Sequence, residues 1–135
     1  MKLDRSGVRL CVTSEPVENV ATITWLGTEN INVPPRSPGT ATGTCRPLNP
    51  AGGDIHILTS IPHMHTAGTH LKTVINRAGG GNEILVDKPF RFDEQRSYAT
   101  PAVVRPGDTL TTTCTYNNTT AQTLGFGTVS ELEMC

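Results

Sequence analysis

The sequence predicts an all-β fold, an antiparallel two-sheet β-sandwich or jelly roll of about eight strands. Thirteen glycines and ten prolines among 135 residues leave little room for long helices, because both residue types interrupt them. The 21 threonines favour strands, and no segment shows the 3.6-residue apolar periodicity of an amphipathic helix. A length of 135 residues suits one hydrophobic core, so we expect residues 1–135 to form a single domain.

The N-terminal half contains three apolar runs that we expect to form strands. Residues 8–12 alternate between apolar and other side chains, and residues 23–26 form a second run after a polar loop. Residues 33–39 contain three prolines, which cannot donate ladder hydrogen bonds, so we expect a loop there. In residues 55–61, three isoleucines share one face and a leucine lies on the other, which predicts a strand covered on both sides.

The C-terminal half predicts two hairpin-like units and a closing strand. A glycine-rich turn separates residues 71–76 from residues 83–87, which is typical of a hairpin. A Pro-Gly-Asp turn joins residues 103–105 to residues 109–116, where leucine, threonine, cysteine and tyrosine alternate on one face. Residues 126–134 form the last expected strand.

The charge balance argues against nucleic acid as a partner. Eleven Lys and Arg stand against twelve Asp and Glu, a net charge of −1, whereas phosphate neutralisation needs a basic excess. No apolar run approaches the roughly 20 residues that span a bilayer, so we expect neither a transmembrane helix nor a signal peptide in this sequence. The sequence therefore predicts a soluble chain.

The four cysteines, Cys11, Cys45, Cys114 and Cys135, indicate the redox compartment. None is spaced as CxxC, which argues against a zinc knuckle or a thioredoxin-like motif. Their even number permits two disulfides, and this favours an oxidising compartment over the alternative of buried free thiols.

All four histidines lie between residues 56 and 70. In an extended chain, His63 and His65 project to the same side, about 6–7 Å apart, and can converge on one transition-metal ion. The alternative is a strand that merely exposes two histidines. We expect His56 to fill or flank the core, and His70 to be a solvated strand residue.

A third metal ligand has to come from another part of the chain. Cysteine thiolates suit zinc or copper but are unavailable if paired, which leaves the methionines. Met1 is terminal, and Met64 points away from its flanking histidines in a regular strand. Met134 remains, although on its own it would be interpreted as a core residue.

Several separate motifs occur in a specific order, and together they carry a family resemblance. They are the stretch that runs from residues 6–10 through residues 33–36, the run DIHILTSIPHMH of residues 54–65, Gly68, Leu71-Lys72, Pro106-Gly107-Asp108, Cys114-Thr115-Tyr116-Asn117, Gly125-Phe126-Gly127 and Glu133-Met134-Cys135. In their order and spacing they resemble the C-terminal domain of the copper type II ascorbate-dependent monooxygenases. The resemblance covers nearly the whole chain.

The resemblance implies a metal site and an activity. In the family, two copper-binding β-sandwich domains act together, and the C-terminal one binds copper, dioxygen and substrate. Carried over, the copper ligands are His63, His65 and Met134. Two neutral imidazoles and a thioether form a soft, uncharged set that favours Cu(I), and an open fourth position admits dioxygen. The activity implied is hydroxylation of an unactivated C–H bond of a small-molecule or peptide substrate.

The resemblance also implies partners that this sequence does not contain. Electrons from ascorbate pass through a second copper, which is held by three histidines of an N-terminal domain. Since His56 and His70 adjoin the first site, no three histidines remain for that second copper. We expect the chain to bind copper but to need the N-terminal domain for turnover.

The resemblance pairs Cys114 with Cys135, and counting then leaves Cys11 with Cys45. Two disulfides would place the chain in a secreted, periplasmic or vesicle-lumen location. The sequence ends one residue after Met134, and chain ends commonly fray, so we expect weakened binding by this residue.

Two other functions fit the same residues. One is a copper-binding module that delivers or stores the ion without hydroxylation. The other is a structural β-sandwich with a lapsed site, for which failure to bind copper would be diagnostic.

Overall fold

A computed structural model describes residues 6–47, 49 and 52–135, which form eight strands and no helix. The strands are β1 (Asn32–Val33), β2 (Ser37–Cys45), β3 (Ile55–Ser60), β4 (Gly68–Asn76), β5 (Asn82–Pro89), β6 (Tyr98–Val104), β7 (Thr109–Asn118) and β8 (Leu124–Gly125). Accordingly, no helix among these residues could cross a membrane. Met1, one of the three methionines, lies outside the described residues.

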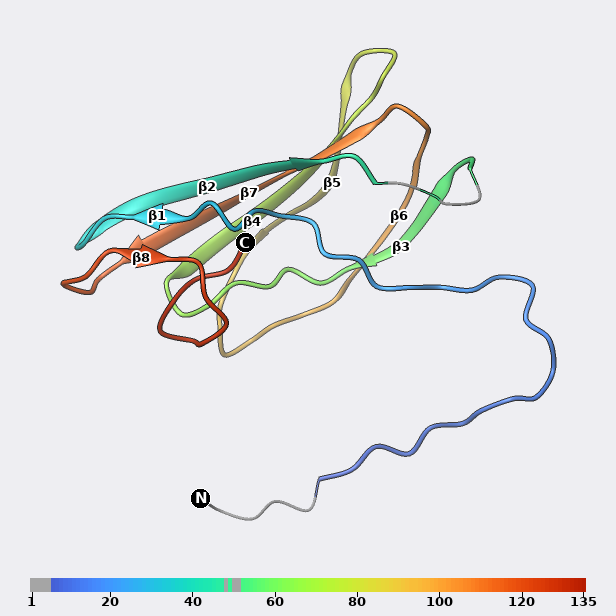
Figure 1. The fold of residues 1–135 in the computed structure, drawn as a ribbon, viewed down its shortest axis with the longest axis horizontal. Coiled ribbons are helices and arrows are strands. Elements are labelled where there is room, and N and C mark those ends of the chain that lie inside the picture. Colours follow the sequence, from blue (N-terminus) through green and yellow to red (C-terminus); the bar gives the residue numbers. More distant parts are fainter. Residues whose placement is uncertain (1–5, 48, 50–51) are drawn as a thin grey trace.

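The strands form two layers. A four-stranded sheet has the order β2-β7-β4-β5, while β3 pairs with β6 and β1 pairs with β8 in two small sheets. Every pair of named strands is antiparallel. Figure 1 shows β3 and β6 as a separate layer beside the four-stranded sheet. The predicted all-β sandwich is therefore confirmed.

The central strand β7 carries the core. Leu110, Thr112, Cys114 and Tyr116 alternate along it and each is at most 1% exposed, as the sequence pattern predicts. The intervening threonines face the other side, where the hydroxyls of Thr111 and Thr113 pair with threonine hydroxyls of the neighbouring strand β2. Leu110 belongs to a cluster that joins the four-stranded sheet to β3 and β6.

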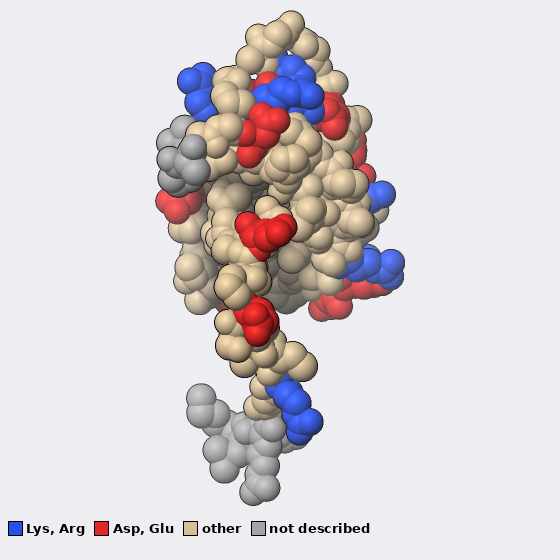
Figure 2. Space-filling view, turned by 90° about the vertical axis from the view of Figure 1, so that its right-hand side faces the viewer, with Lys and Arg blue, Asp and Glu red and all other residues tan. Residues whose placement is uncertain are grey.

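The two expected N-terminal strands are absent. Residues 8–12 and 23–26 pair with no strand, and Val8 and Trp25 are 85% and 76% exposed. Figure 1 shows the blue N-terminal segment, from residue 6 onward, extending away from the sheets, and Figure 2 shows it projecting below the body of the protein. An alternating pattern forms a strand only where a partner strand accepts it, and the described residues offer none here.

Two expectations about the middle of the chain are wrong. Part of the expected loop, Ser37–Gly39, belongs to β2, because an edge strand tolerates a proline such as Pro38. β3 is not covered on both faces: Ile55 and Ile57 pack against a core cluster, whereas Leu58 on the other face is exposed, as is Ile61 beyond the end of the strand at Ser60.

The hairpin of β4 and β5 is confirmed, but the second hairpin-like unit is not a hairpin. β6 pairs with β3, whereas β7 lies between β2 and β4, so the turn between β6 and β7 crosses from one layer to the other. The expected last strand, residues 126–134, forms turns instead, with one isolated bridge between Phe126 and Glu133.

Asp108 fixes the turn where the chain changes layers. Its carboxylate is 4% exposed and accepts hydrogen bonds from the backbone N–H groups of Ala78 and Arg105 and from the Arg77 guanidinium. These donors lower the pKa of Asp108 from 3.8 to about 2. Arg77 also donates to the Val103 carbonyl, 2.7 Å away, so the network ties the β4–β5 hairpin to the end of β6.

Replacing Asp108 with asparagine should lower the free energy of unfolding at neutral pH. The pKa of Asp108 in the folded chain lies below 3.8, the ordinary value for an aspartate side chain. Its carboxylate therefore stabilises the fold above about pH 4, and this contribution is lost as the pH falls towards 2. In urea unfolding, the gap between wild type and Asp108→Asn should therefore narrow across that range. The exposed Asp93→Asn is the control, and a gap that does not change with pH would contradict the assignment.

Candidate metal centre

The structure brings His63 and His65 together, although not within a strand. Both lie in the connection between β3 and β4. Their ring centroids are 5.5 Å apart, with the ring planes almost perpendicular. Between them, Met64 is fully buried in the larger core cluster. The extended backbone thus separates a core-facing methionine from two neighbouring imidazoles, as the spacing predicts.

The environment of His65 determines which ring nitrogen carries its proton. His65 is 5% exposed, and its Nδ1 lies 3.0 Å from the Leu132 carbonyl oxygen. A carbonyl oxygen only accepts hydrogen bonds, so Nδ1 carries the hydrogen in the neutral ring. The lone pair is then on Nε2, the nitrogen that remains for a metal ion.

Aromatic rings flank the histidine pair on both sides. The Trp25 ring lies 6.1 Å from the His63 ring, and the Phe92 ring lies 6.2 Å from the His65 ring, both in edge-to-face geometry. His63 itself is half-buried, and its Nδ1 lies 2.8 Å from Gln95 Oε1. The pair therefore has an apolar surface beside it and one polar partner at each Nδ1.

Glu133 holds the histidine connection in place, a role that the sequence pattern did not reveal. Its carboxylate is fully buried and accepts hydrogen bonds from the backbone N–H of His65, at 3.1 Å, and of Ala67, at 2.7 Å. Burial raises the pKa of Glu133, while these two bonds oppose the shift. The only available signal was its place in the Glu-Met-Cys motif, because nothing local in the sequence indicates its distant backbone partners.

Met134 lies in a segment that is held at three points. Cys135 forms a disulfide with Cys114 of β7, which confirms the predicted pairing. The Tyr116 hydroxyl donates to the Met134 carbonyl oxygen, 3.0 Å away, and Glu133 holds the histidine connection. The expected frayed end is therefore wrong, because long-range contacts fix the half-buried Met134 and its neighbours.

The second predicted disulfide is wrong. Cys11 and Cys45 are free thiols. Cys11 is exposed on the N-terminal segment, in a stretch that pairs with no strand, whereas Cys45 is half-buried at the end of β2. The pairing rested on counting alone, and counting does not bring two Cα atoms within the distance a disulfide needs.

The other two histidines lie apart from the site. His56 is exposed on β3, so the expectation that it fills or flanks the core is wrong. His70 is a solvated strand residue, as predicted, and its Nε2 lies 2.9 Å from an oxygen of Asp87, which also pairs with Lys72. Among the described residues, no three or more His, Cys, Asp or Glu side chains form a cluster that could hold a metal.

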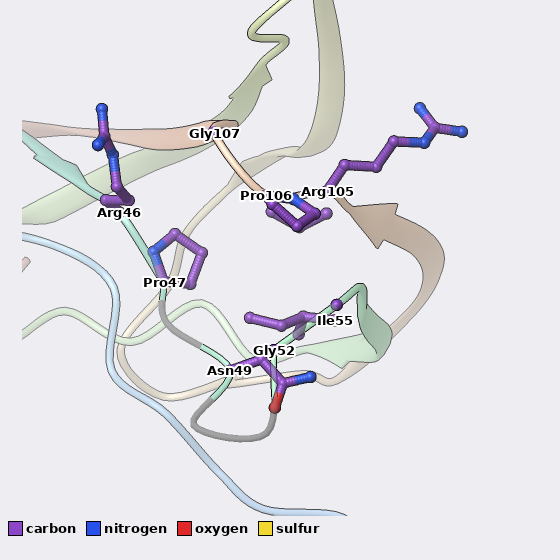
Figure 3. Close-up of a pocket in the computed structure, with 10 residues that line it drawn as sticks. Arg46, Pro47, Asn49, Gly52, Ile55, Arg105, Pro106 and Gly107 are labelled. Atoms are coloured by element: carbon purple, nitrogen blue, oxygen red, sulfur yellow. The ribbon is translucent and has the colours of Figure 1, made fainter.

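A pocket at the opposite end of β3 from the histidines does not contribute to the site. Ile55, at the start of β3, lines it together with Arg46 and Arg105. Figure 3 shows both arginine side chains extending away from the pocket rather than into it. The pocket therefore presents no converging cationic groups.

The fold and the site together define an all-β sandwich protein with a paired-histidine site. The chain belongs to the copper type II ascorbate-dependent monooxygenase family, because residues 19–135 match the sequence model of the family described as "Copper type II ascorbate-dependent monooxygenase, C-terminal domain". The family is by its description dependent on copper and ascorbate, and its members are oxidoreductases.

Curated relatives agree with this assignment. Dopamine beta-hydroxylase of Bos taurus is 34% identical over 143 residues, which cover 96% of this chain and 23% of that protein. The Homo sapiens protein of the same name gives the same values. DBH-like monooxygenase protein 2 of Mus musculus is 31% identical, with 98% of this chain and 24% of that protein covered. The chain spans less than a quarter of the length of these relatives.

Replacing Glu133 with glutamine should destabilise the fold. A glutamine side chain keeps one acceptor oxygen but turns an NH₂ group toward a backbone N–H, so one buried donor loses its partner, at a cost of about 1–3 kcal/mol. Urea unfolding should show this loss for Glu133→Gln and almost none for the exposed control Glu131→Gln. Equal stability of the two variants would show that the buried carboxylate does not hold the histidine connection.

Proposed function

We propose that this chain supplies the dioxygen-activating copper site of a monooxygenase, with His63, His65 and Met134 as the metal ligands. One observation carries the proposal. Two neighbouring imidazoles each have a hydrogen-bond partner at Nδ1, which leaves both Nε2 atoms for a metal ion. The proposed thioether ligand, Met134, follows Glu133 directly and so belongs to the segment that holds His65 in place.

The remaining donors around the site favour this ligand set. Cys114 and Cys135 form a disulfide, so neither supplies a thiolate. The carboxylate of Glu133 is occupied by two backbone N–H groups. Two neutral imidazoles and a thioether are soft ligands that suit Cu(I), whereas Mg²⁺ and Ca²⁺ require oxygen ligands. Copper therefore fits the residues that are present.

The chemistry supplied by bound copper would be the activation of dioxygen for C–H hydroxylation, with electrons drawn from ascorbate. The chain's own part is to hold the two imidazoles in one tautomer and orientation. Trp25 and Phe92 add apolar surface beside them. We infer that a small-molecule or peptide substrate enters on this side.

The partners and location follow from the same proposal. The relatives are about four times longer than the matched part, which leaves room for a separate N-terminal copper domain that passes electrons to this site. The Cys114–Cys135 disulfide is typical of an oxidising compartment, so we place the protein in a secreted, periplasmic or vesicle-lumen location.

Substitution of the ligands tests the copper site. The chain should bind about one Cu(I), as measured by metal analysis and by competition with a chromophoric chelator. His63→Ala and His65→Ala should each weaken binding by more than the roughly 10–100-fold typical of losing an outer partner. Met134→Ala, which removes a weaker ligand, should leave residual binding.

His56→Ala and His70→Ala are the matched controls and should bind copper as the wild type does. Loss of Cu(I) binding in His70→Ala, together with retained binding in His65→Ala, would refute the ligand set. Failure of the wild-type chain to bind any copper would favour a structural β-sandwich.

This chain alone should bind copper, whereas repeated hydroxylation of substrate should require the full-length parent protein. Copper binding needs only the residues of this chain, whereas sustained hydroxylation needs electrons delivered through the N-terminal domain. Oxygen uptake coupled to ascorbate should therefore be observed for the copper-loaded parent but not for residues 1–135 alone. Multiple turnovers by the chain alone would contradict the proposal, and a parent that binds copper without oxygen uptake would indicate delivery or storage instead.

A further inference from the structure

The connection between β5 and β6, residues 90–97, contacts both histidines of the site. The Phe92 ring lies beside His65, and Gln95 Oε1 lies 2.8 Å from His63 Nδ1. The connection is anchored where it begins, because Phe90 is buried and its N–H donates to the Thr69 carbonyl oxygen, 2.8 Å away. A loop from outside the histidine connection therefore contributes a contact to each ring.

The hydrogen bonds of Gln95 determine the orientation of its amide. Gln95 Nε2 lies 3.3 Å from the Phe92 carbonyl oxygen, which only accepts hydrogen bonds. The NH₂ group of Gln95 must therefore face Phe92, and its Oε1 faces His63. Since Oε1 also only accepts, the neutral His63 ring carries its hydrogen on Nδ1 and its lone pair on Nε2.

The two histidines reach the same tautomer by different means. His65 donates to the backbone carbonyl of Leu132, which no substitution of a side chain removes. His63 depends on one exposed side chain, Gln95. Without a partner at Nδ1, a neutral imidazole populates both tautomers and rotates about its side-chain bonds, so its Nε2 is not always available.

We propose that Gln95 is a positioning residue that fixes His63 as the Nδ1–H tautomer and so presents its Nε2 to the metal ion. In its metal-binding part, this inference rests on the proposed function. Its first part, the tautomer of His63, does not require a metal and is measured on the metal-free chain.

The tautomer is read by ¹⁵N NMR of the imidazole nitrogens at a pH where both rings are neutral. In the wild-type chain, both His63 and His65 should be Nδ1–H tautomers. Gln95→Met keeps the length of the side chain but removes the strong acceptor, and should convert His63 to a mixture while His65 stays unchanged. Gln95→Glu keeps an acceptor and should preserve the Nδ1–H tautomer.

Glu94→Gln is the matched control, because Glu94 lies in the same loop, is exposed, and pairs with Arg96. It should leave both histidines as in the wild type. A His63 signal in Gln95→Met that is identical to the wild-type signal would overturn the proposal. A disturbed loop would also change His65, through its contact with Phe92, so the unchanged His65 signal separates positioning from misfolding.

Competition for Cu(I) with a chromophoric chelator then tests the link to the metal. Loss of an outer hydrogen-bond partner typically weakens metal binding 10–100-fold, so Gln95→Met should bind Cu(I) about tenfold more weakly, and Gln95→Glu and Glu94→Gln should not. Unchanged affinity in Gln95→Met would overturn the positioning role. A wild-type chain that binds no Cu(I) would refute the proposed function instead, while the NMR result still decides the tautomer of His63.

Discussion

The buried carboxylate of Glu133 is the constraint on which the arrangement of the candidate metal centre depends. Its two oxygens accept the backbone N–H groups of His65 and Ala67, which lie 68 and 66 residues away in the sequence. Burying a carboxylate without partners is strongly unfavourable, and so is burying two N–H groups without acceptors. Each side therefore satisfies the other, and the segment that carries Met134 stays against the histidine connection.

The central strand β7 holds the segment around Glu133 and Met134 against the four-stranded sheet. It pairs with β2 on one side and β4 on the other, and two of its core-facing residues, Cys114 and Tyr116, bind the segment around Met134 through the disulfide and a hydrogen bond. Burial and the nearby Glu133 charge raise the pKa of Tyr116, so its hydroxyl remains a donor at neutral pH. The histidine connection, the segment around Met134 and the four-stranded sheet are thus joined by contacts between residues that are 18 to 68 positions apart in the sequence.

The features that could be predicted from the sequence are those that depend on a local residue pattern. Alternation along β7 identified its core face, and the spacing of His63 and His65 placed their rings together, because an extended chain fixes both. The strand expected over residues 8–12 failed, since alternation does not supply a partner strand. The pairing of Cys11 with Cys45 failed because counting gives no distance. Glu133 was missed because its partners are backbone groups, which carry no sequence signal.

The two histidines are held by different kinds of contact, so the two halves of the candidate site differ. His65 is buried, and backbone groups and Glu133 fix it from the core. His63 is half-buried and relies on an exposed loop and on the exposed Trp25. Segments with few buried contacts open at lower free energy than core elements do. The candidate site is therefore held by the core on the His65 side, whereas on the His63 side it depends on contacts with exposed residues.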